Sequence, residues 1–150
     1  MSESAIRAVI KTDLEAVTGI GKVYPRLRWT TDQLKFKEAF KTTSDVVNAW
    51  MITRFKTTAE HVNSDQISRR HSFKIVGVYG FNDEDATEDT FQALVEAVVT
   101  KFNADRDLGG AAFDSGPMQV ETVEFRMFSG VLCHYAELTL EVEEMVTWAE

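Results

Sequence analysis

Cysteine and proline are scarce in this chain of 150 residues, which contains one Cys and two Pro. The single thiol, Cys133, excludes a disulfide framework and a cysteine-rich zinc site. No apolar run approaches the roughly 18 residues of a membrane-spanning helix, and no segment typical of a signal peptide opens the sequence. We therefore expect a soluble intracellular domain with no membrane partner.

Length and composition indicate one domain covering residues 1–150. Domains most often contain about 100–150 residues, and a chain of this size buries roughly two-thirds of its unfolded surface. Apolar residues make up 44% and charged residues 27% of the sequence, unlike a disordered or fibrous chain. No linker or repeat divides it.

Positive charge is also scarce, and it is unevenly distributed. Residues 1–75 carry 13 basic and 8 acidic side chains, whereas residues 76–150 carry 3 and 16. An acidic protein is a poor ligand for the phosphates of nucleic acids. Two interpretations of the uneven charge stay open. Either the halves interleave and their charges mix on one surface, or a basic and an acidic surface attract copies of the chain.

Hydrophobic periodicity predicts two amphipathic helices, over residues 5–17 and 91–102. A short helix is also predicted over residues 30–41. Before the second amphipathic helix, Asp85 and Glu88 stand three residues apart and resemble a capping box.

β-branched and aromatic residues predict a first pair of strands, over residues 46–56 and 69–80. The polar stretch between them, residues 57–68, is either the tip of a hairpin or a mobile loop. Gly77 inside the second strand indicates a bulge or a close approach of the backbone.

A second hairpin is predicted from alternating residues 118–128 and 131–143 around the turn at 129–130. Residues 103–117 have loop composition, and loops of this length are usually functional or disordered. The predicted fold class is α+β: an antiparallel sheet of about four strands in two hairpins, with two amphipathic helices packed on one face.

Residues suited to catalysis or metal binding form no recognisable constellation. His61, His71 and His134 lack the spacing that presents two imidazoles to one metal. Cys133 and His134 are neighbours in a predicted strand, so they point to opposite faces and cannot act as nucleophile and base. We expect no catalytic residue, no metal and no cofactor.

The acidic run at residues 83–89 does not fit a calcium-binding EF-hand loop. Glu88 and Leu94 stand where that loop needs Gly and Glu. A looser oxygen-ligand site is one alternative. The preferred interpretation is that the carboxylates stabilise the N-terminus of the following helix.

Two further features bear on contacts with other molecules. Arg69 and Arg70 form a small basic cluster, for which a solvated strand end is the default interpretation. Trp148, near the C-terminus, either folds back on the domain or inserts into a neighbouring chain.

The order of elements and several short segments are similar to those of a known family. The segments are IRAVI (6–10), GIGKVY (19–24), WMITR (50–54), RHSFKIVG (70–77), FQALVEA (91–97) and AELTLEV (136–142). Together they resemble the tail terminator proteins of long-tailed phages and phage-like gene transfer particles, also called minor tail or tail completion proteins. The likeness covers most of the chain except residues 57–68 and 103–117, and the family has no catalytic signature to match.

The resemblance implies a small α+β subunit of a ring, usually a hexamer, at the head-proximal end of the tail in the virion, assembled in the host cytoplasm. Such a ring ends polymerisation of the tail tube protein and docks the head–tail connector protein, while DNA passes transiently through its lumen. Candidate subunit or docking contacts are Arg54, Arg69, Arg70, Asp83, Glu84, Asp85, Phe113 and Trp148. Candidate lumen-facing acids are Glu137, Glu141 and Glu143, with plain solvent-facing surface as the alternative.

Other functions stay open at this point. One alternative is another protein of the neck region, such as a head–tail joining protein, which the sequence does not separate from a tail terminator. A small α+β ligand-binding module would act as a dimer and hold a metabolite between helices and sheet. An enzyme using His71 or His134 with nearby carboxylates is the third class.

Overall fold

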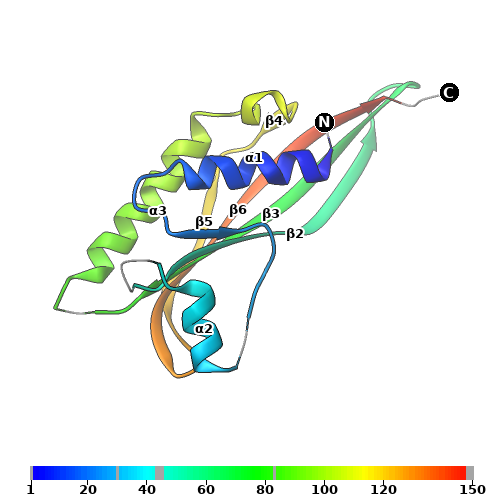
Figure 1. The fold of residues 1–150 in the computed structure, drawn as a ribbon. Coiled ribbons are helices and arrows are strands. Elements are labelled where there is room, and N and C mark those ends of the chain that lie inside the picture. Colours follow the sequence, from blue (N-terminus) through cyan, green and yellow to red (C-terminus); the bar gives the residue numbers. More distant parts are fainter. Residues whose placement is uncertain (1, 30, 43–45, 83, 148–150) are drawn as a thin grey trace.

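The computed structural model describes residues 2–29, 31–42, 46–82 and 84–147. These residues form an α+β fold of three α-helices and an open six-stranded sheet, which confirms the predicted class (Figure 1). The elements are α1 (Glu3–Glu15), β1 (Lys22–Tyr24), α2 (Gln33–Phe40), β2 (Asn48–His61), β3 (Gln66–Gly80), α3 (Thr87–Asn103), the 3₁₀ turn η1 (Leu108–Gly110), β4 (Asp114–Ser115), β5 (Gln119–Phe128) and β6 (Val131–Thr147).

The strands are ordered β1-β2-β3-β6, and the far edge of β6 pairs with both β4 and β5. β1 and β2 are parallel, and the other pairs among the described strands are antiparallel. Both predicted hairpins are present, but the sheet has six strands where about four were expected. The two extra strands, β1 and β4, contain three and two residues, which is too short for an alternating pattern to emerge in the sequence.

The β2–β3 hairpin is longer than the sequence indicated. Most of the polar stretch 57–68 is strand, because β2 continues to His61 and β3 begins at Gln66. Residues such as Thr58 and Glu60 have exposed side chains, but their backbones pair with β3. Figure 1 shows this hairpin and the end of β6 extending past the helices.

Helices cover parts of both faces of the sheet. The amphipathic helices α1 and α3 pack on one face, as expected. The short helix predicted over residues 30–41 is α2, and it packs on the opposite face through Phe36 and Phe40. The expectation of helices on one face alone is therefore wrong, because the two aromatic residues of α2 need an apolar surface of their own.

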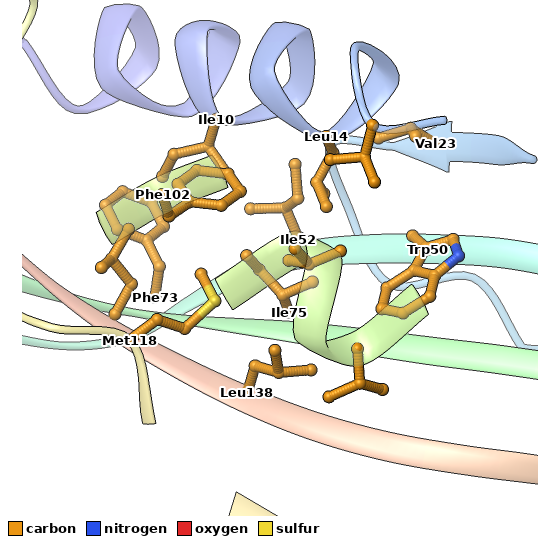
Figure 2. Packing of buried hydrophobic residues seen from close by; sticks show 14 of the residues in the cluster. Ile10, Leu14, Val23, Trp50, Ile52, Phe73, Ile75, Phe102, Met118 and Leu138 are labelled. Atoms are coloured by element: carbon orange, nitrogen blue, oxygen red, sulfur yellow. The ribbon is translucent and has the colours of Figure 1, made fainter. Parts of the chain in front are cut away.

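Alternation along β3 divides the core into two clusters. Phe73 and Ile75 point into the larger cluster beneath α1 and α3, where they meet residues such as Ile10 and Phe102 (Figure 2). Val76 and Val78 point to the opposite face, into the smaller cluster beneath α2. The centre of the sheet is thus buried on both faces, whereas its two ends are not.

Gly77 lets the indole of Trp50 lie against the backbone of β3. The two residues are directly opposite one another, and a Cβ at position 77 would lie 2.5 Å from Cζ3 of Trp50. Trp50 is fully buried, and its Nε1 donates to Oδ1 of Asn48 at 3.0 Å. Asn48 in turn donates to the carbonyl of Gly19 at 2.7 Å, which ties β2 to the turn after α1. The predicted close approach at Gly77 is confirmed.

The segment 103–117 is packed and does not form a disordered loop. It contains η1 and β4, and Leu108 and Ala112 are buried in the larger cluster. β4 then pairs with β6 through Asp114 and Ser115. The segment therefore closes one end of the core beneath α1.

The start of α3 differs from the predicted capping box. Ala86 is the N-cap residue, with a left-handed backbone (φ 51°) and no side-chain capping bond, so Asp85 and Glu88 do not form the expected motif. Instead, the hydroxyl of Thr87 accepts from the backbone N–H of Asn82 at 2.9 Å. Within the described residues, none of the helices has the length and apolar character needed to cross a bilayer.

Candidate functional site

The outer strand β5 carries an exposed row of apolar side chains. These residues face the same side of the sheet as α1 and α3, but the helices pack over β2, β3 and β6 and leave β5 uncovered. Met127 is 62% and Phe125 is 52% exposed. The expectation that helices bury the apolar side of both hairpins is therefore wrong for β5. We call this exposed region the β5 surface, and its members are Phe81, Val120, Val123, Phe125, Met127 and Leu132.

At one end of the β5 surface, the rings of Phe81 and Phe125 meet edge to face, with centroids 5.4 Å apart. Next to both rings lies the buried imidazole of His134, 5.1 Å from the ring of Phe125. Its Nε2 is 2.8 Å from the hydroxyl of Thr87. Burial lowers the pKa of His134, although the nearby carboxylate of Glu88 opposes the shift. The imidazole is therefore neutral near pH 7 and forms a packed support for the aromatic pair.

A hollow of about 320 Å³ lies between this aromatic pair and the first turn of α3. Glu88 and Asp89 line it and are exposed. The predicted contact residues Glu84 and Asp85 are exposed in the preceding turn, while Asp83 lies outside the described residues. The hollow thus has one aromatic wall and an acidic rim.

Arg70, a predicted contact residue, is paired within the chain. Its guanidinium lies 3.2 Å from Glu141 and 3.3 Å from Glu143, across the β3–β6 ladder. These are two of the predicted lumen-facing acids. On these strands the basic and acidic halves of the sequence mix on one surface, as the first of the two charge interpretations states.

Arg69 and Arg54 are also engaged. Nη1 of Arg69 lies 3.1 Å from Oε1 of Glu144, and Nε of Arg54 lies 4.0 Å from Oε1 of Glu3 in α1. A contact between copies through any of these arginines would compete with an existing ion pair.

The three predicted lumen-facing acids project from one side of β6, opposite to α1 and α3. Here α2 does not cover the sheet, and an open hollow of about 710 Å³ lies beside Glu137 and Glu141. Phe55 and Lys74 also line it, with the ammonium of Lys74 5.5 Å from the ring of Phe55. The structure therefore brings the acids together, with two of them paired to arginine as described above.

Phe113, another predicted contact residue, lies apart from the β5 surface. Phe113 is 57% exposed in the loop before β4, where its backbone N–H donates to the carbonyl of Glu143 at 2.9 Å. Phe125 pairs with His134, at the other end of β6. Trp148 lies outside the described residues. Those predicted contact residues that the structure describes thus do not form one surface.

A buried hydrogen-bonded pair of His71 and Glu144 was not predicted. Glu144 follows Leu140 and Val142 in phase along β6, so it occupies a core-facing position of the strand. A carboxyl group at a core-facing position of a strand is the sequence signal for this pair, because a buried polar group requires a hydrogen-bond partner.

The described residues include no group of three or more His, Cys, Asp or Glu placed to hold a metal ion. Cys133 lies in the smaller cluster and His134 on the opposite face, which confirms that the two cannot meet. Burial raises the pKa of Cys133 to about 12, so its thiol stays protonated at neutral pH.

No protein-family model and no curated protein sequence matches this chain. The resemblance to tail terminators therefore stays a prediction from short segments and element order. The surfaces described above are the basis for proposing a function.

Proposed function

We propose that this chain is a structural subunit without enzymatic activity, which assembles into a ring at the head-proximal end of a phage-type tail tube. The β5 surface carries the assembly part of the proposal. β5 is a ten-residue outer strand with exposed apolar side chains, and its outer backbone edge pairs with no other described strand. Such a strand favours association with another protein surface. The resemblance to tail terminators supplies the kind of assembly.

In this role the ring, a hexamer, ends polymerisation of the tail tube protein and gives the head–tail connector protein a surface to dock on. The side of β6 with Glu137, Glu141 and Glu143 lines the lumen. Negative charge there suits the transient passage of DNA, because fixed positive charge would hold the phosphates. The chain acts in the virion after assembly in the host cytoplasm, and it needs no membrane.

Native mass spectrometry of the purified chain is the direct test. We expect one closed oligomer of six subunits, and a ring at the head-proximal end of the tail in particles that contain the protein. A chain that is monomeric at all protein and salt concentrations, in particles without a ring, would contradict the proposal. Binding to the connector alone, without tail tube protein, would instead indicate a neighbouring neck or head–tail joining protein.

The open hollow of about 710 Å³ beside Lys74 and Phe55 favours a second candidate, a small ligand-binding module that acts as a dimer. This candidate predicts two subunits in native mass spectra and a rise in melting temperature with a small molecule. It has less support than a ring because the hollow is open and two of its polar lining residues, Thr139 and Glu121, already bind each other.

An enzyme using His71 or His134 is the least supported class. Each imidazole has a buried structural partner, Glu144 or Thr87. We therefore expect His71→Ala to lower stability and to leave assembly of the folded protein unchanged.

A further inference from the structure

The face of the sheet that α2 covers carries, beside this helix, a surface of complementary chemistry. The segment that follows β1 reads Arg-Leu-Arg-Trp over residues 26–29, so it alternates basic and apolar side chains. Leu27 is 43% and Trp29 46% exposed, and Arg26 is exposed as well. Lys35 of α2 lies beside Arg28 and Trp29. We call residues 26–29 together with Lys35 the basic loop.

The charges of the basic loop are not neutralised by carboxylates of the same chain. Among the described residues, Arg26, Arg28 and Lys35 form no ion pair. The guanidinium of Arg28 is held over the ring of Tyr24, at 4.5 Å from its centroid. The basic loop therefore differs from Arg69 and Arg70, whose charges are compensated across the β3–β6 ladder.

The rim of the hollow beside Phe125 has the opposite character. Glu88 and Asp89 of the rim, and Glu84 in the preceding turn, are exposed and, within the described part of the chain, take part in no ion pair. A guanidinium placed in this hollow would meet an aromatic face on one side and carboxylates on the other. Both contacts favour arginine.

The positions of the two surfaces determine the symmetry of a contact between them. Trp29 of the basic loop stacks on Phe128, the last residue of β5, with ring centroids 5.0 Å apart, on the face of the sheet that α2 covers. The β5 surface is on the other face, the side of α1 and α3, so the two surfaces face away from each other in one subunit. A contact between two different surfaces is head to tail, and it leaves one copy of each surface free for the next subunit. Such a contact produces a ring when the rotation closes.

We propose that the basic loop of one copy docks on the β5 surface of the next copy. Arg26 enters the hollow between Phe125 and Glu88, and Leu27 covers the neighbouring apolar row. This inference rests on the proposed ring function and identifies the contact that builds the ring.

Two variants of the full chain test the contact. Phe125→Gln removes the aromatic wall, and Arg26→Glu combined with Leu27→Gln disables the basic loop. Because all three positions are exposed, we expect both variants to keep the circular dichroism spectrum and melting temperature of the wild type. Each variant alone should be monomeric where the wild type is oligomeric, with subunit affinity weakened by roughly tenfold or more.

Mixing the two variants gives a sharper result. Each retains the surface that the other lacks, so an equimolar mixture should form a one-to-one dimer and no larger species in native mass spectra. Val62→Gln and Lys56→Glu are matched controls, because they change an exposed apolar and an exposed basic residue of the β2–β3 hairpin and its turn. Both controls should assemble like the wild type.

The possible failures are distinguishable. A wild-type ring that persists in both variants would overturn this contact and leave the ring itself standing. A ring lost in the two variants, with a mixture that stays monomeric, would also overturn the head-to-tail pairing of these two surfaces. A wild-type chain that is monomeric throughout would overturn the contact together with the proposed function.

Discussion

Nε2 of His71 lies 2.8 Å from Oε1 of Glu144, and both side chains are almost completely buried, at 0% and 1% exposed. The residues are 73 positions apart in the chain and lie on neighbouring strands, β3 and β6. The other ring nitrogen of His71 is 2.9 Å from the hydroxyl of Thr57 on β2. Three strands are therefore joined through one imidazole near the end of the sheet.

Removing the carboxylate of this group should cost much of the stability of the fold. Glu144→Ala leaves His71 without a partner on Nε2 inside the protein, and we expect a loss of about 2–4 kcal/mol in the free energy of unfolding. Urea denaturation measures it. Glu141→Ala is the matched control, because it removes an exposed partner of Arg70 on the same strand, and its effect should stay within about 1 kcal/mol. Equal losses in the two variants would show that burial of the pair is unimportant.

Gly77→Ala tests the packing of Trp50 against β3. The added methyl group would lie 2.5 Å from Cζ3 of a fully buried indole, so the ring or the strand must shift. We expect destabilisation of about 2–3 kcal/mol in chemical denaturation, a typical cost of overpacking. In the control Gly116→Ala, the nearest atom to the new methyl group is the carbonyl oxygen of Glu141 at 3.8 Å. A Gly77 variant as stable as this control would contradict the proposed close packing.

Asp13 should make stability depend on pH near neutrality. Burial raises the pKa of this carboxyl to about 7, reinforced by the hydrogen bond and negative charge of Asp105, while Lys101 opposes the shift. The unfolded chain releases the same proton near pH 4. The folded state therefore binds more protons between these values. Protonation of Asp13 therefore stabilises the folded state. This stabilisation is complete below about pH 4 and is lost as the pH rises through about 7.

Asp13→Asn removes this dependence. We expect the variant to exceed the wild type in unfolding free energy by about 1–3 kcal/mol at pH 8, and by less at pH 5. Thermal denaturation at both pH values measures the difference. Glu15→Gln changes an exposed carboxylate in the same helix and should show no such pH-dependent gain. A constant difference between the Asp13 variant and the wild type would contradict the raised pKa.

Ring assembly should weaken as ionic strength rises, since the proposed contact joins a basic loop to an acidic rim. Raising the salt concentration from about 0.01 M to 1 M shortens the screening length from about 30 Å to 3 Å. Sedimentation velocity across this range should show that the oligomer dissociates at a higher protein concentration in high salt than in low salt. Assembly that strengthens with salt would indicate that apolar contacts alone join the subunits.

Element types with strong periodicity were predicted correctly. The stripes of α1 and α3 and the alternation of β5 and β6 reflect burial of one side, which is a local property of the sequence. The short β1 and β4 were missed, because strands of two or three residues have no detectable period. The extension of the β2–β3 hairpin through residues 57–68 was missed for a different reason. There the backbone pairing is regular, while the side chains are exposed and polar.

The candidate site was only partly predictable. From the sequence we predicted that acidic residues around Glu84 and the basic cluster at Arg70 contact a partner. Local sequence does not show whether such charges already have a partner within the chain. Pairing of Arg70 with Glu141 arises from residues about 70 positions apart, so no local pattern reveals it. The β5 surface was misjudged because an alternating strand shows which side is apolar and not whether a helix reaches it.

The sequence by itself determined the class of this protein: an α+β fold with a single thiol, a surplus of acidic residues in its second half, and two helices with a side to bury. These properties follow from composition and local periodicity. Only the tertiary structure decided which charges remain uncompensated and which apolar residues stay exposed. Register across β3 and β6 neutralises Arg69 and Arg70, while the limited width of the helical layer leaves β5 uncovered. Contact with another chain depends on those long-range outcomes, because they set the charge and apolar area that a partner meets.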